Sequence, residues 1–242
     1  MLYKDYKDFD LFQEKLSEWD IKLSEHQKQM FMDYYEFLIE RNTVMNLTAI
    51  TEFKEVINKH FIDSLALIKV HKLTNERVLD LGTGAGFPGI PLKIVYPDIE
   101  ILLLDSLNKR IIFLKDVIEK LNLRNIEALH GRAEDFGSSF QYREKYDLCV
   151  SRAVAKLSIL SEYCIPFVKK NGYFIAYKSG NIEEEIKQSK EAIKKLGGSI
   201  VKTEELILPG TDIERKLVLI QKSNNTPKIY PRSAGKPVKE PL

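Results

Sequence analysis

A glycine-rich turn followed by a distant carboxylate is the pattern in this chain with the clearest chemical meaning. The apolar run Val78–Leu81 leads directly into Gly82-Thr83-Gly84-Ala85-Gly86, and Asp105 ends the next apolar run, about 20 residues on. Glycines tolerate positive φ and let a ligand approach the backbone without a Cβ in the way. A carboxylate at the end of the second strand can accept hydrogen bonds from ribose hydroxyls. The pattern therefore predicts a binding site for a nucleotide-like cofactor that includes Gly82, Gly84 and Asp105.

Two cofactors fit a glycine turn of this kind. Counted from Gly82 the spacing is G-x-G-x-G, but counted from Gly84 it also satisfies the dinucleotide pattern G-x-G-x-x-G. Pro88 and Pro91 lack the backbone N–H groups with which a helix N-terminus would bind a pyrophosphate. Ala133-Glu134 follows the third expected strand, where methyltransferases contact the adenine edge. These features favour S-adenosylmethionine, with a dinucleotide such as NAD as the alternative.

The elements that must position this turn follow from the hydrophobic pattern. Residues 1–75 read as a helical extension, with a capping box at Ser24 and Gln27 and an expected helix N-cap at Thr51. From Arg77 onward, short apolar runs alternate with amphipathic stretches of helical length, which predicts right-handed βαβ units and a parallel sheet. The expected strands are Val78–Leu81, Ile101–Leu104, Ile126–Leu129, Leu148–Val150 and Tyr173–Ala176. The expected helices are Pro88–Tyr96, Asn108–Leu121, Val154–Val168 and Ile182–Leu196.

Two details refine the sheet. The five runs look too apolar for edge strands. The final two strands, Ser199–Leu206 and Lys216–Gln221, are separated by a turn at Pro209-Gly210 and not by a helix, so they should pair antiparallel. The predicted fold is α/β, a Rossmann-like class I methyltransferase with a mostly parallel seven-stranded sheet. It spans residues 76–222 and leaves 223–242 as a C-terminal arm.

Composition sets broad limits on function. Hydrophobic residues make up 44% and charged residues 30% of the chain, as in soluble globular proteins, and no secretory signal or membrane span is visible, so we expect a cytoplasmic protein. Cys149 and Cys164 lack metal-ligand spacing, so no metal site is expected. The overall net charge is only +2, yet the segment from Lys222 to the C-terminus carries five basic residues against Glu240. A basic arm among prolines predicts an extended segment that binds an RNA backbone, with a disordered solubilising tail as the alternative.

Longer motifs spread over the chain resemble the ribosomal small-subunit methyltransferase G family, also called glucose-inhibited division protein B. The match rests on the following segments: Asn46-Leu47-Thr48-Ala49-Ile50, His60-Phe61-Ile62-Asp63-Ser64-Leu65, DLGTGAGFPGIP at Asp80–Pro91, Asp105-Ser106 with Lys109-Arg110, Arg132-Ala133-Glu134, Ser151-Arg152-Ala153, and the tail from Tyr230-Pro231-Arg232 to Pro241-Leu242. Ser233 and Glu240 depart from the family, because basic residues are common at these two positions.

The resemblance implies methylation at N7 of one guanosine in a conserved loop of 16S ribosomal RNA, either naked or in a ribonucleoprotein assembly intermediate. It implies no obligate protein partner. It also implies that the methyl donor is held by the following residues: Gly82, Phe87, Ala133, Glu134 and Arg152, with Asp105 at the ribose. A small-molecule methyltransferase and a non-catalytic RNA-binding protein are the remaining alternatives.

The acceptor site is less defined by the sequence. Asn46, His60 and Asp63 could line a base pocket or could serve as helix caps and interhelical hydrogen-bond partners. Lys178 and Arg232 could contact phosphate or could be solvated cations. Guanine N7 has a free lone pair and no proton, so its methylation needs no general base. The sequence agrees, because it has no D/N-P-P-Y/F tetrapeptide and no Pro-Cys nucleophile, and it identifies no catalytic residue.

Overall fold

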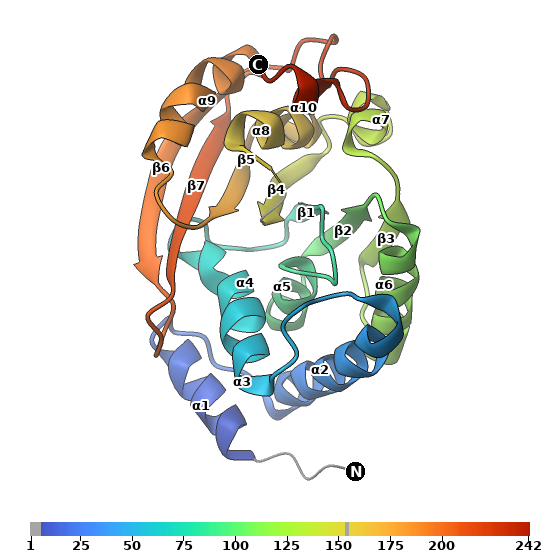
Figure 1. The fold of residues 1–242 in the computed structure, drawn as a ribbon, viewed down its shortest axis with the longest axis vertical. Coiled ribbons are helices and arrows are strands. Elements are labelled where there is room, and N and C mark those ends of the chain that lie inside the picture. Colours follow the sequence, from blue (N-terminus) through green and yellow to red (C-terminus); the bar gives the residue numbers. More distant parts are fainter. Residues whose placement is uncertain (1–5, 153–154) are drawn as a thin grey trace.

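The computed structural model describes residues 6–152 and 155–242. A seven-stranded sheet crosses the middle of the molecule, and helices cover both of its faces (Figure 1). The strands are β1 (Arg77–Leu81), β2 (Glu100–Asp105), β3 (Ile126–His130), β4 (Tyr146–Arg152), β5 (Val168–Lys178), β6 (Gly198–Ile207) and β7 (Glu214–Lys222). The α-helices are α1 (Tyr6–Ser17), α2 (Glu25–Met45), α3 (Phe53–Val56), α4 (Asp63–Leu65), α5 (Gly89–Val95), α6 (Asn108–Lys120), α7 (Ala133–Ser138), α8 (Leu157–Cys164), α9 (Glu183–Lys195) and α10 (Lys236–Lys239).

The strand order is β3-β2-β1-β4-β5-β7-β6, and β7 alone runs in the opposite direction to the other six strands. The predicted parallel sheet with an antiparallel C-terminal hairpin is therefore confirmed. The expectation that no early strand lies at an edge was wrong, because β3 is an edge strand. The apolar residues of β3 suggested a strand covered on both sides, but burial alternates along it and only Ala128 in its centre is fully covered.

Strand order reverses between β1 and β4, because the chain moves outward from β1 to β3 and then returns to the other side of β1. The carboxyl ends of β1, β2 and β4 therefore meet at the crevice where doubly wound folds bind ligands. Gly82, Asp105 and Arg152 lie at or directly after these three strand ends. The topology thus brings together residues that are far apart in the sequence.

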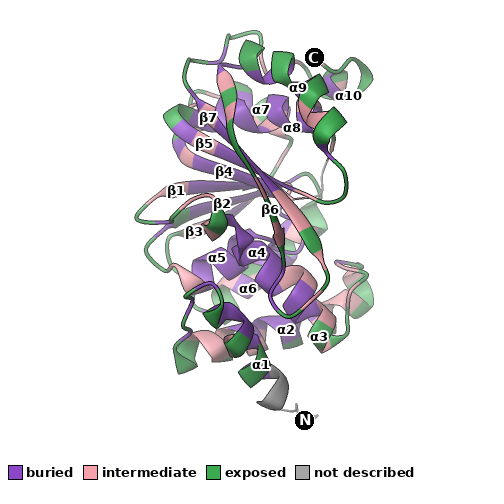
Figure 2. Cartoon of the chain, turned by 90° about the vertical axis from the view of Figure 1, so that its left-hand side faces the viewer, coloured by how far each residue is buried: buried purple, intermediate pink, exposed green. Residues whose placement is uncertain are grey.

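The helices before β1 do not form a separate core. Figure 2 shows them with α5 and α6 below the sheet, and α7 to α10 above it. Phe12 and Phe31 pack edge to face, with ring centroids 5.2 Å apart, and Phe61 and Tyr34 extend this aromatic cluster to Phe87 beside the glycine turn. The helical extension is therefore part of the same hydrophobic core as one face of the sheet.

One predicted helix start is confirmed and two others differ from the sequence predictions. The capping box at Ser24 and Gln27 is present. The next helix, however, is capped by the side chain of Glu52 and not by Thr51, because the carboxylate accepts two N–H groups of the first turn. The helix predicted from Val154 begins outside the described residues, and the described helix α8 starts at Leu157.

The segment from Phe53 to Lys69 is an irregular helix. It passes from α3 into a π-helical stretch, η1 (Ile57–Ile62), then into α4 and a 3-10 turn, η2 (Ala66–Lys69). π-helical turns are rare and occur frequently at functional sites. This one carries His60, and the turn after it carries Asp63. No helix in the described part of the chain is long and apolar enough to cross a membrane.

Candidate functional site

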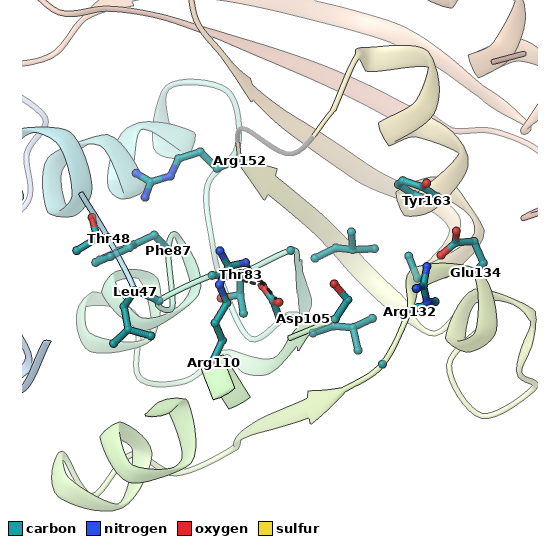
Figure 3. Close-up of a pocket in the computed structure, with 18 of the residues that line it drawn as sticks. Leu47, Thr48, Thr83, Phe87, Asp105, Arg110, Arg132, Glu134, Arg152 and Tyr163 are labelled. Atoms are coloured by element: carbon teal, nitrogen blue, oxygen red, sulfur yellow. Dashed lines mark hydrogen bonds and ion pairs between the residues drawn. The ribbon is translucent and has the colours of Figure 1, made fainter. Parts of the chain in front are cut away.

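A cavity of about 580 Å³ opens at the carboxyl ends of β1, β2 and β4. The glycine turn forms its floor, and Asp105 lies at its centre (Figure 3). At one end lie residues of α7 and α8, including Glu134 and Tyr163, and at the other end lie Phe87 and Arg152. Its volume is in the range of small-molecule and cofactor sites. The cavity brings together all seven residues that were predicted to bind the cofactor: Gly82, Gly84, Phe87, Asp105, Ala133, Glu134 and Arg152.

The glycine turn has the conformation that its composition predicts. Gly82 and Gly84 have φ of 73° and 63°, a region that side chains rarely adopt. A Cβ added at Gly84 would meet no protein atom within 4 Å, so the backbone faces open space at that point. A ligand can therefore approach the main chain there at van der Waals distance.

The helix that follows the turn has no free N–H groups for a pyrophosphate. Gly89 N donates to the Asp80 carboxylate at 2.8 Å, and Ile90 N donates to Gly86 O. Pro88 lacks an N–H group, and so does Pro91 in the first turn. A dinucleotide-binding helix needs these donors for phosphate oxygens. The structure of this helix N-terminus therefore disfavours the dinucleotide alternative.

Asp80 is fully buried beneath the turn and holds its shape. One carboxylate oxygen accepts hydrogen bonds from the Thr83 hydroxyl at 2.6 Å and from Gly89 N. The other oxygen has no partner among the described residues. Burial raises the pKa of Asp80 to about 7, although the hydrogen bonds from Thr83 and Gly89 act in the opposite direction.

Asp105 is held for hydrogen bonding on the cavity floor. Its side chain is 2% exposed, and it accepts hydrogen bonds from Gly84 N and Leu107 N, each at 2.9 Å. Arg110 forms an ion pair with it at 3.1 Å. The same guanidinium nitrogen lies 3.4 Å from the other carboxylate oxygen, a long contact that a ribose hydroxyl could replace. The sequence analysis named Arg110 only within the family-like segment Lys109-Arg110, and its place five residues after the acid was the available signal.

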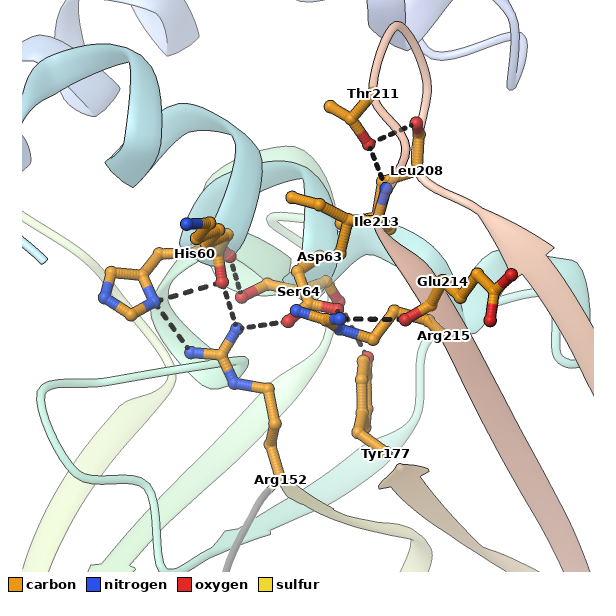
Figure 4. Close-up of polar contacts among 11 residues, drawn as sticks. His60, Asp63, Ser64, Arg152, Tyr177, Leu208, Thr211, Ile213, Glu214 and Arg215 are labelled. Atoms are coloured by element: carbon orange, nitrogen blue, oxygen red, sulfur yellow. Dashed lines mark hydrogen bonds and ion pairs between the residues drawn. The ribbon is translucent and has the colours of Figure 1, made fainter. Parts of the chain in front are cut away.

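Arg152 connects the end of β4 to the irregular helix. Its guanidinium donates to Asp63 at 3.0 Å and to Lys59 O at 3.1 Å, and it lies 5.2 Å from the centroid of the Phe87 ring (Figure 4). Asp63, only 3% exposed, also pairs with Arg215 of β7 at 2.9 Å. A single buried carboxylate therefore joins the helical extension to both β4 and β7.

His60 lies against this ion-pair network in its neutral form. Its ring stacks on Phe87 with centroids 4.3 Å apart, and Nδ1 lies 3.2 Å from a guanidinium nitrogen of Arg152. Nδ1 also lies 3.1 Å from Lys59 O, which can only accept, whereas the guanidinium can only donate. Nε2 lies 2.9 Å from the Thr48 hydroxyl, which can donate or accept, so the contacts accommodate either neutral tautomer. Burial and the nearby Arg152 charge lower the pKa of His60 to about 3.

A second cavity, of about 440 Å³, adjoins the first and shares His60 and Arg152 with it. Asp63, Lys178 and Arg215 also line this cavity. Lys178 is not a solvated cation: its ammonium is bonded to Ala155 O at 2.7 Å and to Glu185 at 2.6 Å. Three of the predicted substrate-binding residues, His60, Asp63 and Lys178, thus line one cavity.

The other two predicted substrate-binding residues lie elsewhere. Asn46 is the left-handed C-cap of α2, so the structure gives it the capping role that was the alternative, and its contact with substrate stays a prediction. Arg232 was expected on an extended arm that contacts RNA; the structure pairs it with a carboxylate, and its contact with RNA stays a prediction. Its guanidinium forms a two-pronged ion pair with the buried Glu162 of α8, at 2.8 and 2.6 Å. The arm is also not wholly extended, because it ends in the short helix α10.

Several cavity residues were not among those predicted to bind a ligand. Tyr163 comes from the C-terminal end of α8, and Leu47 and Thr48 come from the loop after α2. Their positions depend on how distant elements pack. Cys149 and Cys164 are buried free thiols and line neither cavity.

Comparison with known proteins places this site in context. Residues 27–217 match the family model described as rRNA small subunit methyltransferase G. A protein of Lachnoclostridium phytofermentans named ribosomal RNA small subunit methyltransferase G is 54% identical, with 98% of each chain covered. The protein of the same name from Thermoanaerobacter sp. is 51% identical over 98% of this chain and 99% of its own.

Solved structures share the fold at low sequence identity. A SAM-dependent methyltransferase from Aquifex aeolicus has a TM-score of 0.52 and 16% identity, covering 71% of this chain and 94% of its own. A putative methyltransferase in complex with the Trm112 activator of Haloferax volcanii has a TM-score of 0.56 and 14% identity, covering 78% of this chain and 98% of that chain. At this identity the likeness concerns the fold alone.

Proposed function

The chain belongs to the rRNA small subunit methyltransferase G family, and we propose that it transfers the methyl group of S-adenosylmethionine to N7 of a guanosine in 16S ribosomal RNA. The observation that carries this proposal is the pair of adjoining cavities. One has the residues of a methyl-donor site, the other has four cationic side chains among the ten residues that line it, and His60 and Arg152 belong to both.

The first cavity fits S-adenosylmethionine along its length. Asp105 would accept hydrogen bonds from the ribose hydroxyls, and the Glu134 carboxylate would accept one from the adenine amino group. The methionine part would lie over the turn at Gly82 and Gly84, toward Phe87. When bound, this cofactor supplies an electrophilic methyl group on a sulfonium centre. The fit rests on the open face of the turn and on the placement of the two carboxylates at different points of the cavity.

The second cavity would receive the target nucleotide. Four cationic residues line it, Lys59, Arg152, Lys178 and Arg215, against two carboxylates. An excess of positive charge suits the phosphates that flank a nucleotide in RNA. The wall shared with the first cavity would place the base beside the methyl donor. N7 lies in the deep groove of A-form RNA, so the guanosine must be unstacked before it can enter.

The chain's own residues would act by positioning. N7 attacks with a lone pair that carries no proton, so no residue has to remove one. His60 is neutral, which keeps a further positive charge away from the sulfonium and from the base that becomes cationic. Arg152, fixed by Asp63 and by the ring of Phe87, would orient the acceptor between the two cavities. None of these groups is assigned proton transfer.

The donor assignment is tested by a matched pair of glycine substitutions. Gly84→Ala would place a methyl group in open space at the cavity floor, and Gly180→Ala would place one in open space outside both cavities. Both glycines have positive φ, 63° and 71°, so the backbone strain is similar. We expect Gly84→Ala alone to lower both the affinity for S-adenosylhomocysteine in calorimetry and the transfer of labelled methyl to 16S RNA. Equal behaviour of the two variants would contradict the assignment.

A further inference from the structure

The C-terminal arm (residues 223–242) lies folded against α7 and α8, the two helices that form one end of the first cavity (Figure 1). Gly137 of α7 packs near Pro231 of the arm, and Leu242 packs against the second hydrophobic core. A tail that served only to reach for RNA would have no need of these contacts. The arm therefore has a structural relation to the cavity that its charge does not explain.

The first anchor of the arm is on α8. The Arg232 guanidinium and backbone N–H together make three hydrogen bonds to the Glu162 carboxylate, at 2.6 to 2.9 Å. The Glu162 side chain is 1% exposed, so this is a buried, two-pronged ion pair. The next residue along α8 is Tyr163, which lines the cavity. The anchor thus joins the arm to a helix that forms part of the cavity wall.

The second anchor is Arg143, in the loop after α7. Its guanidinium donates to Tyr230 O and Thr226 O, both at 2.6 Å, and to Gly137 O at 3.0 Å. One side chain therefore binds the arm and the C-terminal end of α7 at the same time. Burial lowers the pKa of Arg143, which agrees with a guanidinium enclosed mainly by backbone carbonyls.

The arm also bonds directly to a residue of the cavity. Gly235 N donates to Oε1 of Glu134 at 3.0 Å, and Glu134 lies in the first turn of α7. Gly235 has a φ of 80°, a conformation that turns the chain back toward α7 before α10 begins. Within the described residues this is the one hydrogen bond that holds the carboxylate of the buried Glu134.

We propose that the C-terminal arm is a positioning element of the methyl-donor site, which fixes α7 and the Glu134 carboxylate so that this carboxylate can accept the adenine amino group. The inference rests on the proposed function, because it assumes that the adenine lies at this end of the cavity. Gly235, Arg232 and Arg143 act through Glu134 and are positioning residues. The exposed Lys236 and Lys239 take no part in holding Glu134.

The test compares four proteins. Three are full-length: the unchanged chain, Arg232→Lys, and the double variant Lys236→Gln with Lys239→Gln. The fourth is a shortened chain that lacks residues 234–242. The shortened chain loses the Gly235 bond. Arg232→Lys keeps the charge of the arm but cannot form a two-pronged pair. The double variant lowers the charge of the arm and leaves its anchors intact. Calorimetry with S-adenosylhomocysteine gives the donor-site affinity of each.

We expect removal of residues 234–242 to weaken S-adenosylhomocysteine binding about tenfold, the change for one hydrogen bond to a charged group. Arg232→Lys should weaken it by a smaller factor, and the double variant should leave it unchanged. Amide hydrogen exchange of the ligand-free protein should be faster at Phe136 and Ser139, whose N–H groups bond within and after α7. The shortened chain should also discriminate less between adenosine and inosine as ligands of the donor site, because inosine lacks the amino group that Glu134 would bind. General destabilisation would not change that preference.

Unchanged affinity and unchanged exchange in α7 after removal of residues 234–242 would overturn the proposal. Equal weakening by the double lysine variant would overturn it as well, because charge and not anchoring would then be the cause. If the shortened chain does not fold, Arg232→Lys decides the matter, and wild-type affinity in that variant contradicts the proposal. Failure of the unchanged chain to bind S-adenosylhomocysteine would contradict the donor assignment instead, while the exchange of α7 would still report on the arm.

Discussion

His60 provides a prediction whose size follows from its surroundings. In the unfolded chain its pKa is 6.5, whereas burial and the Arg152 charge lower it to about 3 in the folded protein. Between these two values the unfolded state binds more protons than the folded state, so stability decreases as the pH falls. The contribution of a neutral His60 to the stability of the folded protein is complete above pH 6.5 and is progressively lost toward pH 3. From pH 7.5 to pH 5.5 the expected loss is about 1.4 kcal/mol.

Asp80 has the opposite dependence and must be separated from His60. Its pKa rises from 3.8 in the unfolded chain to about 7 in the folded one, so its contribution is present below pH 3.8 and is lost as the pH rises through 7. The two residues therefore nearly cancel in the wild-type protein between pH 4 and 6.5. Only the difference between wild type and a His60 variant isolates the histidine.

The assay is urea unfolding of wild type and His60→Gln at pH 7.5 and 5.5. Glutamine does not titrate, so the stability advantage of wild type over His60→Gln should shrink by about 1.4 kcal/mol at the lower pH. His26→Gln, at an exposed position of α2, is the control, because it leaves the His60 environment unchanged. An advantage that is the same at both pH values would show that His60 titrates normally in the folded state. An advantage that grows at pH 5.5 would show a cationic His60, which contradicts the neutral ring expected from its burial and the nearby Arg152 charge.

Three further substitutions test other parts of the structure. Tyr34→Phe removes the hydroxyl that donates to Ala85 O at 2.5 Å beneath the turn, so the free energy of unfolding in urea should decrease by about 1–3 kcal/mol. Calorimetry should show weaker binding of the methyl donor, and unchanged values in both measurements would refute this role. Gly89→Ala places a Cβ 2.3 Å from Leu103, so its melting temperature should fall by roughly 4–8 °C or more, and a wild-type value would contradict the close packing. Asp63→Asn leaves two largely buried arginines without their carboxylate, so stability should fall by about 3 kcal/mol. Methyl transfer should fall at least tenfold, whereas the affinity for S-adenosylhomocysteine should change little. A purely structural Asp63 would show the stability loss without the selective loss of transfer.

Local patterns were sufficient for the part of the site that lies on consecutive elements. The turn after β1 and Asp105 at the end of β2 are fixed by a strand–turn–helix–strand unit, which the hydrophobic periodicity indicates. The hairpin of β6 and β7 was also predictable, because a short turn cannot hold a crossover helix. In these cases the chemistry and the element that carries it are close in sequence.

The remaining part of the site depends on contacts between distant segments. Asp63 pairs with Arg215, 152 positions later, and the π-helical stretch before Asp63 has no simple periodicity that would predict its pairing. Arg232 shows the same limit, because a basic residue among prolines looks solvated until Glu162 is seen to be buried opposite it. Composition predicted the charge of the arm but not its partner.

Mass spectrometry of 16S ribosomal RNA from cells with and without this gene tests the central claim most directly, because it reports the acceptor base, the modified atom and its position together. The account predicts that one N7-methylguanosine is present in the first sample and absent from the second. It also predicts that a plasmid copy restores this methylation and that the same copy with Gly84→Ala does not. Persistence of every N7-methylguanosine of 16S RNA in cells without the gene would contradict the proposed function.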